Sequence, residues 1–314
     1  MEAVELKKIV EEMKSPRPFV RGRAVDALMR VRDEAAIPVL FKLVQKEMDF
    51  IKVNFCRFLG KVRSPAGVAP LVSLLLGPSE KVAAEATFAL DRIDHDKKTE
   101  ALMYLLGEKN HFAKVYAIKA LAAEKKIKAV PLLIDALPRE NPEMRELVID
   151  ALRQIADPAA IAPLMKLLPG ADKNTLYAAL YALGEIGERG TAPPLFPYLQ
   201  HEDPDIRRAA VWALARLKCA GAVPAFLDLL KNDPSDEVRE EVCRRLAALG
   251  GRKAVKPLLF ACARDRSNNV RKYAGWALQE IPLPEKREVL LRFKDDQDKK
   301  LREVALFELG VKPK

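Results

Sequence analysis

Apolar side chains recur along this chain with a long and regular period. Ten leucines stand 31 residues apart, except for two steps of 32 residues between Leu214 and Leu278. Around these leucines the apolar positions follow helical spacing. A sustained period of this length is typical of stacked two-helix units, which bury their apolar faces against their neighbours. The leucines are Leu28, Leu59, Leu90, Leu121, Leu152, Leu183, Leu214, Leu246, Leu278 and Leu309.

The first helical pattern of each repeat is clearest at residues 157–168. Asp157 is a candidate N-cap there, and Pro158 occupies the first turn, where a missing N–H costs nothing. A second proline recurs within this helix, and we expect it to bend the helix because it removes a backbone hydrogen bond. These prolines are Pro38, Pro70, Pro131, Pro163, Pro194, Pro224 and Pro257.

The second helical pattern carries the leucine. The residue four positions before it is small or apolar in all ten repeats, and the residue directly before it is usually alanine. Small residues at these places let the next helix pair approach closely. The sequence therefore predicts an all-α solenoid that spans residues 1–314 as a single domain. We expect the first and last pairs to act as caps, with Glu308 contributing to a polar outer end.

The repeat motifs resemble a known family. An Asp-Pro opening precedes an apolar residue and an arginine in residues 203–207 and 233–239, an Ala-x-x-Ala-Leu centre follows, and a proline lies in the preceding helix. These features resemble the HEAT-like repeats first described in phycobilisome lyases, over nearly the whole chain. The resemblance implies a right-handed α-solenoid of about ten helix pairs. It implies little about function, because this repeat serves many unrelated tasks.

A basic residue stands seven positions before the leucine in eight of the ten repeats. A row of phosphate contacts is one interpretation. However, this position lies within about 20° of the leucine on a helical wheel, so it belongs to the buried side. Three acidic residues, Asp233, Asp265 and Asp296, stand six positions before such a residue. The family resemblance implies bonds between such Asp and Arg residues of neighbouring repeats, and we expect a structural role.

The position two residues before each leucine faces away from it, by about 160°. By resemblance, this outward row lines the concave side of the superhelix. Half of its members are aromatic, against 6% of the chain, and both tryptophans belong to it. We call these ten residues the inner row: Asp26, Arg57, Phe88, Lys119, Asp150, Tyr181, Trp212, Arg244, Trp276 and Phe307.

Aromatic and arginine side chains at exposed positions are typical anchors of binding surfaces. For Phe88 and Phe307, packing against the next repeat is an equal alternative to binding. Towards the C-terminus the rings alternate with basic residues on adjacent turns, which favours binding. The predicted partner site comprises Tyr177, Tyr181, Arg208, Trp212, Arg216, Arg244, Lys272, Tyr273 and Trp276.

Composition limits the other chemistry. The net charge of +10 is spread thinly, the N-terminal stretch lacks the apolar core of a signal peptide, and no apolar run approaches the ~18 residues of a membrane span. The four scattered cysteines favour free thiols in the cytoplasm, with Cys56 and Cys243 buried and inert. We expect no catalytic residues, no metal and no cofactor. His201 is interpreted as a capping residue.

Two further patterns are interpreted as structural. Glycines at positions 184, 187 and 190 suggest a helix end and turn rather than a phosphate loop. Glu240 and Glu241 lie on one face and could form a paired-carboxylate site, but a solvated acidic turn is the simpler interpretation.

Three functions remain open at this stage. The first is a non-enzymatic scaffold or adaptor that binds a protein or extended peptide with acidic groups in the concave groove. The second is nucleic-acid binding, by resemblance to HEAT-like alkylpurine DNA glycosylases, which are shorter and less regular. The third is a tetrapyrrole-handling subunit similar to a bilin lyase. The oligomeric state and the identity of the partner do not follow from the sequence.

Overall fold

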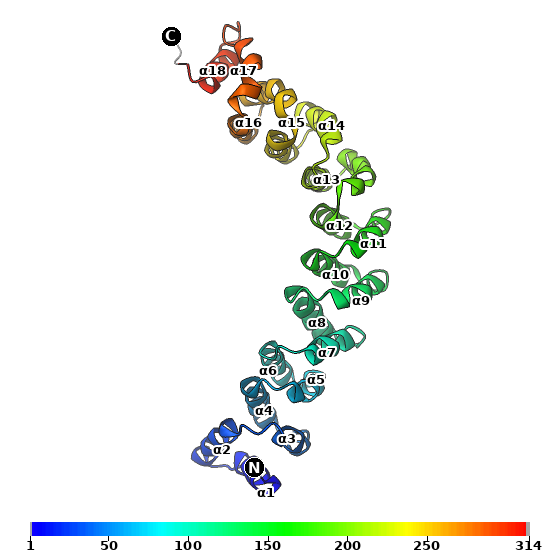
Figure 1. Cartoon of the computed structure of the whole chain (residues 1–314), viewed down its shortest axis with the longest axis vertical. Coiled ribbons are helices and arrows are strands. Elements are labelled where there is room, and N and C mark those ends of the chain that lie inside the picture. The colour runs from blue at the N-terminus through cyan, green and yellow to red at the C-terminus, as the bar shows by residue number, and fades with distance from the viewer. Residues whose placement is uncertain (1, 312–314) are drawn as a thin grey trace. The chain divides into compact units, whose positions relative to one another are not determined.

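The computed structural model describes residues 2–311, and these residues form helices joined by turns, without a β-strand. The chain divides into two compact units, Met1–Ala136 and Leu137–Lys314. In each unit consecutive helices pack as antiparallel neighbours, and each pair packs on the next (Figure 1). The α-solenoid predicted from the period is confirmed.

In each pair we call the helix that carries the leucine of the period the inner helix and the other the outer helix. Within residues 2–136, the first unit contains four complete helix pairs and one further outer helix. Its elements are α1 (Ala3–Met13), α2 (Pro18–Arg30), α3 (Ala36–Val44), α4 (Asp49–Val62), η1 (Pro65–Gly67), α5 (Val68–Leu75), α6 (Glu80–Asp91), α7 (Asp96–Leu106), α8 (His111–Ala123), η2 (Ile127–Ala129) and α9 (Val130–Ala136).

The second unit begins with an inner helix and continues with further pairs. Its elements are α10 (Pro142–Ile155), η3 (Pro158–Ala160), α11 (Ile161–Leu167), α12 (Lys173–Ile186), η4 (Arg189–Thr191), η5 (Pro193–Gln200), α13 (Pro204–Arg216), η6 (Ala220–Ala222), α14 (Val223–Asn232), α15 (Asp236–Arg264), α16 (Asn268–Glu280), α17 (Leu283–Leu291) and α18 (Lys299–Glu308).

The leucines of the period form the core, as predicted. Nine of the ten are at most 2% exposed, and Leu309 at the end of the stack is half-buried. The residues four positions earlier pack beside them, and Ala210, Val242 and Ala274 are completely buried. Burial of a side chain of this size stabilises the fold by about 1.5–3 kcal/mol, so the repeated pattern contributes to the stacking at every repeat.

Most of the recurrent prolines lie in the first turn of an outer α-helix rather than in its interior. Several outer helices begin with a short 3-10 turn, and Pro70, Pro131, Pro163 and Pro224 lie in the first turn of the α-helix that follows. Their missing N–H groups remove hydrogen bonds at the point where the helix changes from 3-10 to α geometry. Asp157 caps the turn η3 by accepting a hydrogen bond from the N–H of Ala159 at 2.8 Å, as expected.

The element α15 consists of two helices that follow each other without a loop: the inner helix of one pair and the outer helix of the next. The inner helix ends and the next outer helix begins at Gly251, whose φ of 47° and ψ of −137° break the helix. Such a conformation is accessible to glycine because it has no Cβ. This glycine therefore replaces the longer loops that join the other pairs, and Pro257 lies on the outer half of α15.

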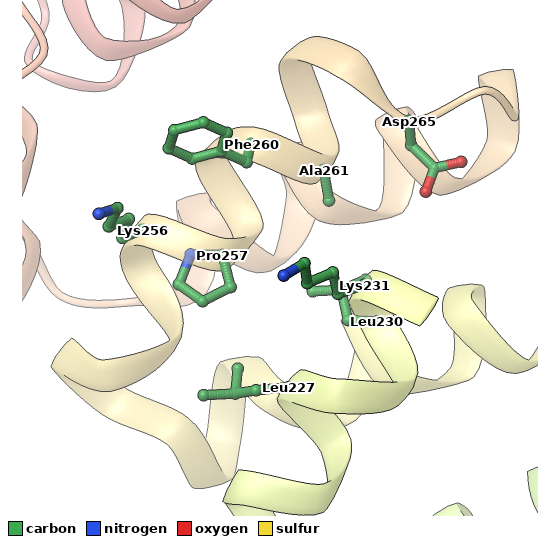
Figure 2. A pocket seen from close by; sticks show the side chains of 8 residues that line it. All are labelled: Leu227, Leu230, Lys231, Lys256, Pro257, Phe260, Ala261 and Asp265. Atoms are coloured by element: carbon green, nitrogen blue, oxygen red, sulfur yellow. The ribbon is translucent and has the colours of Figure 1, made fainter. Parts of the chain in front are cut away.

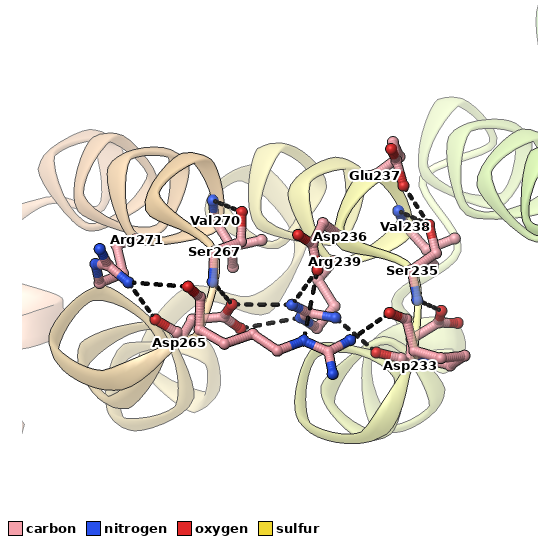
Figure 3. Close-up of polar contacts among 12 residues, drawn as sticks. Asp233, Ser235, Asp236, Glu237, Val238, Arg239, Asp265, Ser267, Val270 and Arg271 are labelled. Carbon is pink, nitrogen blue, oxygen red and sulfur yellow. Dashed lines mark hydrogen bonds and ion pairs between the residues drawn. The ribbon is translucent and has the colours of Figure 1, made fainter.

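The basic row builds an internal ladder, which confirms its structural role. Arg207 donates two hydrogen bonds of 2.8 Å to the carboxylate of Asp233, and both residues are buried. Arg239 repeats this arrangement one pair later, with two bonds of 2.9 Å to Asp265 (Figure 3). Arg239 and Arg271 also donate to the backbone carbonyls of Asp233 and Asp265 respectively. The ladder joins three successive inner helices.

Glu308 does not form a polar outer surface, contrary to the sequence expectation. Its carboxylate lies 2.5 Å from the ammonium group of Lys286, and both side chains are almost fully buried. Lys286 also donates a hydrogen bond of 2.7 Å to the carbonyl oxygen of Leu278. The last pair thus uses the glutamate to neutralise a buried lysine, because an unpaired charge in that position would be costly.

Candidate functional site

The inner row is accessible in both units. None of its ten members is buried. In the first unit Asp26, Arg57, Phe88 and Lys119 are exposed, and Phe88 is 68% exposed. Exposure at this level argues against inter-repeat packing for Phe88. The aromatic members concentrate in the second unit, where the predicted site residues come from four successive inner helices: α12, α13, the first half of α15, and α16.

Three rings form a continuous aromatic cluster across α12 and α13. Tyr177 and Tyr181 lie one turn apart, and their ring centroids are 4.7 Å from each other. The ring of Trp212 lies 4.4 Å from that of Tyr181. All three side chains are half-buried, so their outer faces remain available. Burial, followed by the neighbouring Tyr177 hydroxyl, raises the pKa of Tyr181 above its ordinary value.

The ring of Trp212 packs directly against the backbone of the neighbouring helix at Gly184, which has no side chain. A Cβ atom at Gly184 would stand 2.6 Å from the indole Cζ3 and 2.8 Å from the Cα of Ala213. Gly184 lies inside α12 and is buried, so it is not part of a turn, contrary to the sequence interpretation. Gly187, by contrast, ends this helix as expected. Trp212 therefore combines repeat packing with a partly accessible face.

A second cluster lies on α15 and α16. Tyr273 and Trp276 meet edge to face, with ring centroids 5.1 Å apart. The guanidinium of Arg244 lies 4.1 Å from the centre of the Tyr273 ring, and the ammonium of Lys272 lies 4.5 Å from that of Trp276. Trp276 is 47% exposed. Cations at these distances hold aromatic rings in place by cation–π attraction.

The arginines of the predicted site already have acidic partners. Arg208 pairs with Asp205 at 3.0 Å, and Arg216 pairs with Glu185 at 3.0 Å while its guanidinium lies 5.8 Å from the centre of the Trp212 ring. Arg244 lies 3.0 Å from Glu241. These contacts neutralise much of the positive charge that the sequence assigned to partner binding.

Glu241 is the principal site residue that sequence analysis misjudged. It was interpreted as part of a solvated acidic turn, yet it is 5% exposed. One carboxylate oxygen accepts a hydrogen bond from Arg245 at 2.6 Å and the other accepts one from Arg244 at 3.0 Å. Glu241 thus positions Arg244 against Tyr273. Its spacing of three and four residues from two arginines was the available signal.

The cysteine and histidine side chains considered in the sequence analysis lie in surroundings that give them structural roles. Burial raises the pKa of the Cys56 and Cys243 thiols to about 12, and both are completely buried, as predicted. His201 accepts a hydrogen bond from the N–H of Asp203, the N-cap of α13. Within residues 2–311 no group of three or more His, Cys, Asp or Glu side chains could hold a metal ion. No helix in that range is both long and apolar enough to cross a bilayer.

The rings of the aromatic clusters do not line the two cavities described in the second unit. One of about 560 Å³ lies between α14 and the outer half of α15. Another of about 640 Å³ lies beside Phe307, Cys262 and Gly275 near the end of α18. The aromatic clusters form an open surface, which suits an extended partner more than an enclosed small molecule.

Comparison with solved structures supports the fold. The chain matches an engineered protein with 22% identity and a TM-score of 0.50, covering 99% of this chain and 98% of that chain. It matches Kap95 in the Kap95:Nup1 complex with 14% identity and a TM-score of 0.56, and Kap95p with RanGDP with 13% identity and a TM-score of 0.59. Each match covers 97% of this chain and 50% of that chain, so this chain spans about half the length of these importins.

The phycocyanin lyase complex of CpcE and CpcF from Nostoc sp. also matches, with 20% identity and a TM-score of 0.44, covering 79% of this chain and 94% of that chain. No curated protein matches this sequence. The family described as HEAT repeats matches residues 6–91, 99–173, 163–247 and 223–310, which is nearly the whole chain. With this match, the buried leucine period and the Arg–Asp ladder, the chain belongs to the HEAT-repeat family.

Proposed function

We propose that this protein is a non-enzymatic scaffold or adaptor that binds a protein or an extended peptide along the two aromatic clusters of its second unit, from α12 to α16. The observation that carries this proposal is the series of ordered, partly exposed rings on successive inner helices, from Tyr177 to Trp276. Ordered rings lose little conformational entropy when a partner covers them, which is why such side chains dominate binding energy in many interfaces.

The charge pattern refines the kind of partner. Arg208, Arg216 and Arg244 are engaged by carboxylates of this chain, so an acidic partner would have to compete with those pairs. Lys272 is exposed and lies against Trp276. We therefore propose a partner segment that presents apolar side chains to the rings, with acidic groups contributing mainly beside Lys272.

Several observations support this proposal over the alternatives. Kap95 has the same fold and is seen in complexes with Nup1 and with RanGDP, so a solenoid of this type can bind proteins. Nucleic-acid binding requires basic side chains that can displace the counterions of the phosphates, whereas Arg208, Arg216 and Arg244 are paired with carboxylates of this chain.

We also propose a cytoplasmic location, because all four cysteines are free thiols.

The test is a comparison of co-purified partners from cells. The variant Tyr177→Ala/Trp276→Ala removes one ring from each cluster and leaves Trp212 in its packing position. The matched control is Phe88→Ala/Phe307→Ala, which removes two rings of the inner row that are each 68% exposed and lie outside both clusters. We expect the first variant to lose partners that the wild type and the control retain.

Retention of all partners by the cluster variant would disprove the proposed site. Two further measurements separate the alternative functions. Nucleic-acid binding predicts affinity for DNA or RNA that falls steeply with salt concentration. A tetrapyrrole-handling function predicts quenching of tryptophan fluorescence when a bilin is titrated. We expect neither effect.

A further inference from the structure

The cavity between α14 and the outer half of α15 has the dimensions of a ligand site. Its volume of about 560 Å³ lies within the range of roughly 300–1,000 Å³ that is usual for binding pockets. Its walls come from the outer helices of two successive pairs (Figure 2). It is therefore built from other segments than the inner row, although α15 contributes to both, and it is independent of the function proposed above.

The floor of this cavity is apolar and ordered. Leu227 and Pro257 are half-buried, while Phe260 is 40% exposed. The Phe260 ring meets Phe293 edge to face, with centroids 5.8 Å apart and an interplanar angle of 88°. This contact holds the partly exposed Phe260 ring in place, so the cavity has a preformed apolar wall.

The rim of the cavity is positively charged. Lys231 and Lys256 are both exposed, and within residues 2–311 neither forms an ion pair with a carboxylate. The one carboxylate at the cavity, Asp265, is already bound by Arg239 through two hydrogen bonds of 2.9 Å. The ammonium of Lys256 lies 6.0 Å from the centre of the Phe260 ring. Two unneutralised cations thus flank an apolar floor, unlike the paired arginines of the inner row.

We propose that this cavity docks an acidic amphipathic segment of a partner protein. An apolar side chain of that segment inserts between Leu227, Pro257 and Phe260. Carboxylates that flank it pair with Lys231 and Lys256. The apolar floor supplies most of the affinity, whereas the two lysines select acidic over basic segments.

The test measures binding of a fluorescein-labelled synthetic peptide whose leucines lie one helical turn apart between glutamates. Full-length wild type is compared with Lys231→Glu/Lys256→Glu by fluorescence anisotropy. The matched control, Lys166→Glu/Lys253→Glu, changes the net charge equally at two exposed lysines of α11 and α15 outside the cavity. We expect the cavity variant to lose about tenfold or more in affinity, which is about 1.4 kcal/mol, while the control stays within about twofold.

A second variant tests the apolar contact. Leu227→Ala is expected to lower the affinity for the peptide by about fivefold or more. The salt dependence of binding should not change, because this variant removes only apolar surface that the peptide would bury. Equal weakening by both charge variants would show non-specific attraction and would overturn the proposal, as would unchanged affinity in the cavity variant. Concentration-dependent self-association that is lost on Lys231→Glu/Lys256→Glu would assign the cavity to a second copy instead and would also overturn it.

Discussion

The indole ring of Trp212 occupies the space in which a side chain at position 184 would lie. A Cβ atom on Gly184 would approach the indole Cζ3 to 2.6 Å and the backbone Cα of Ala213 to 2.8 Å. The glycine therefore allows α12 and α13 to approach closely and lets the ring of Trp212 pack against that of Tyr181 at an interplanar angle of 32°. Local packing between two repeats sets the geometry of the first aromatic cluster.

Gly184→Ala should destabilise the second unit by about 1–3 kcal/mol, because the added methyl group overpacks a tight contact that includes backbone. Urea unfolding followed by circular dichroism measures this change. Gly190→Ala is the control, since a Cβ there meets no atom within 4 Å. We expect the control to remain close to the wild type. Equal stability of both variants would show that the two helices separate without cost.

Asp233→Ala should destabilise the protein by about 3–5 kcal/mol, because it leaves the buried guanidinium of Arg207 without its partner. The double variant Arg207→Leu/Asp233→Leu should lose less, since it removes both charges together. Urea unfolding of the single and double variants tests this order. A double variant less stable than Asp233→Ala would show that the pair contributes net stability beyond mutual neutralisation.

The buried thiols predict a loss of stability at high pH. Burial raises the pKa of Cys56 and Cys243 from 9.0 to about 12, so the folded state keeps these protons where the unfolded chain releases them. Their contribution is complete below pH 9 and is lost as the pH rises towards about 12, at about 1.4 kcal/mol per pH unit for each thiol. The variant Cys56→Ala/Cys243→Ala should lose stability less steeply than the wild type across this range. Equal slopes of unfolding free energy against pH for the wild type and the variant would show that these two thiols do not cause the loss of stability.

The two tryptophans should differ in their access to solvent. Trp276 is 47% exposed, whereas Trp212 is half-buried against Gly184. Acrylamide should therefore quench the single indole of Trp212→Phe more efficiently than that of Trp276→Phe. Addition of the natural partner should protect both indoles. Equal quenching without a partner would show that Trp212 does not pack as described.

The architecture could be predicted from the sequence because one physical rule repeats along the whole chain. Each leucine requires burial, and a period of 31 or 32 residues places successive leucines at equivalent points of successive helices. The structural role of the basic row followed in the same way, from its angle to the leucine. The exposure of the inner row, including Trp276, followed from the opposite angle.

Most of the sequence predictions that failed depend on contacts between residues that are distant in sequence. Gly184 was assigned to a turn because its partner, Trp212, lies on the next inner helix. Glu308 was assigned to an outer surface because Lys286 lies on α17 and gives no periodic signal. The arginines of the site were treated as free because their carboxylate partners do not recur from repeat to repeat. The cavity beside Phe260 depends on two outer helices, and no periodic pattern marks it.

The Arg–Asp ladder also has a consequence for how the chain can change in length. Each rung links one inner helix only to the next, from Arg207 to Asp233 and from Arg239 to Asp265. Each rung has an arginine donor on one helix and an aspartate acceptor beside the next. Removal of one whole repeat, such as residues 207–238, would therefore put Arg239 in the place of Arg207 and keep its pairing with Asp265. We therefore expect this part of the chain to tolerate duplication or loss of a complete repeat, whereas an insertion of a few residues within a repeat should separate the rungs.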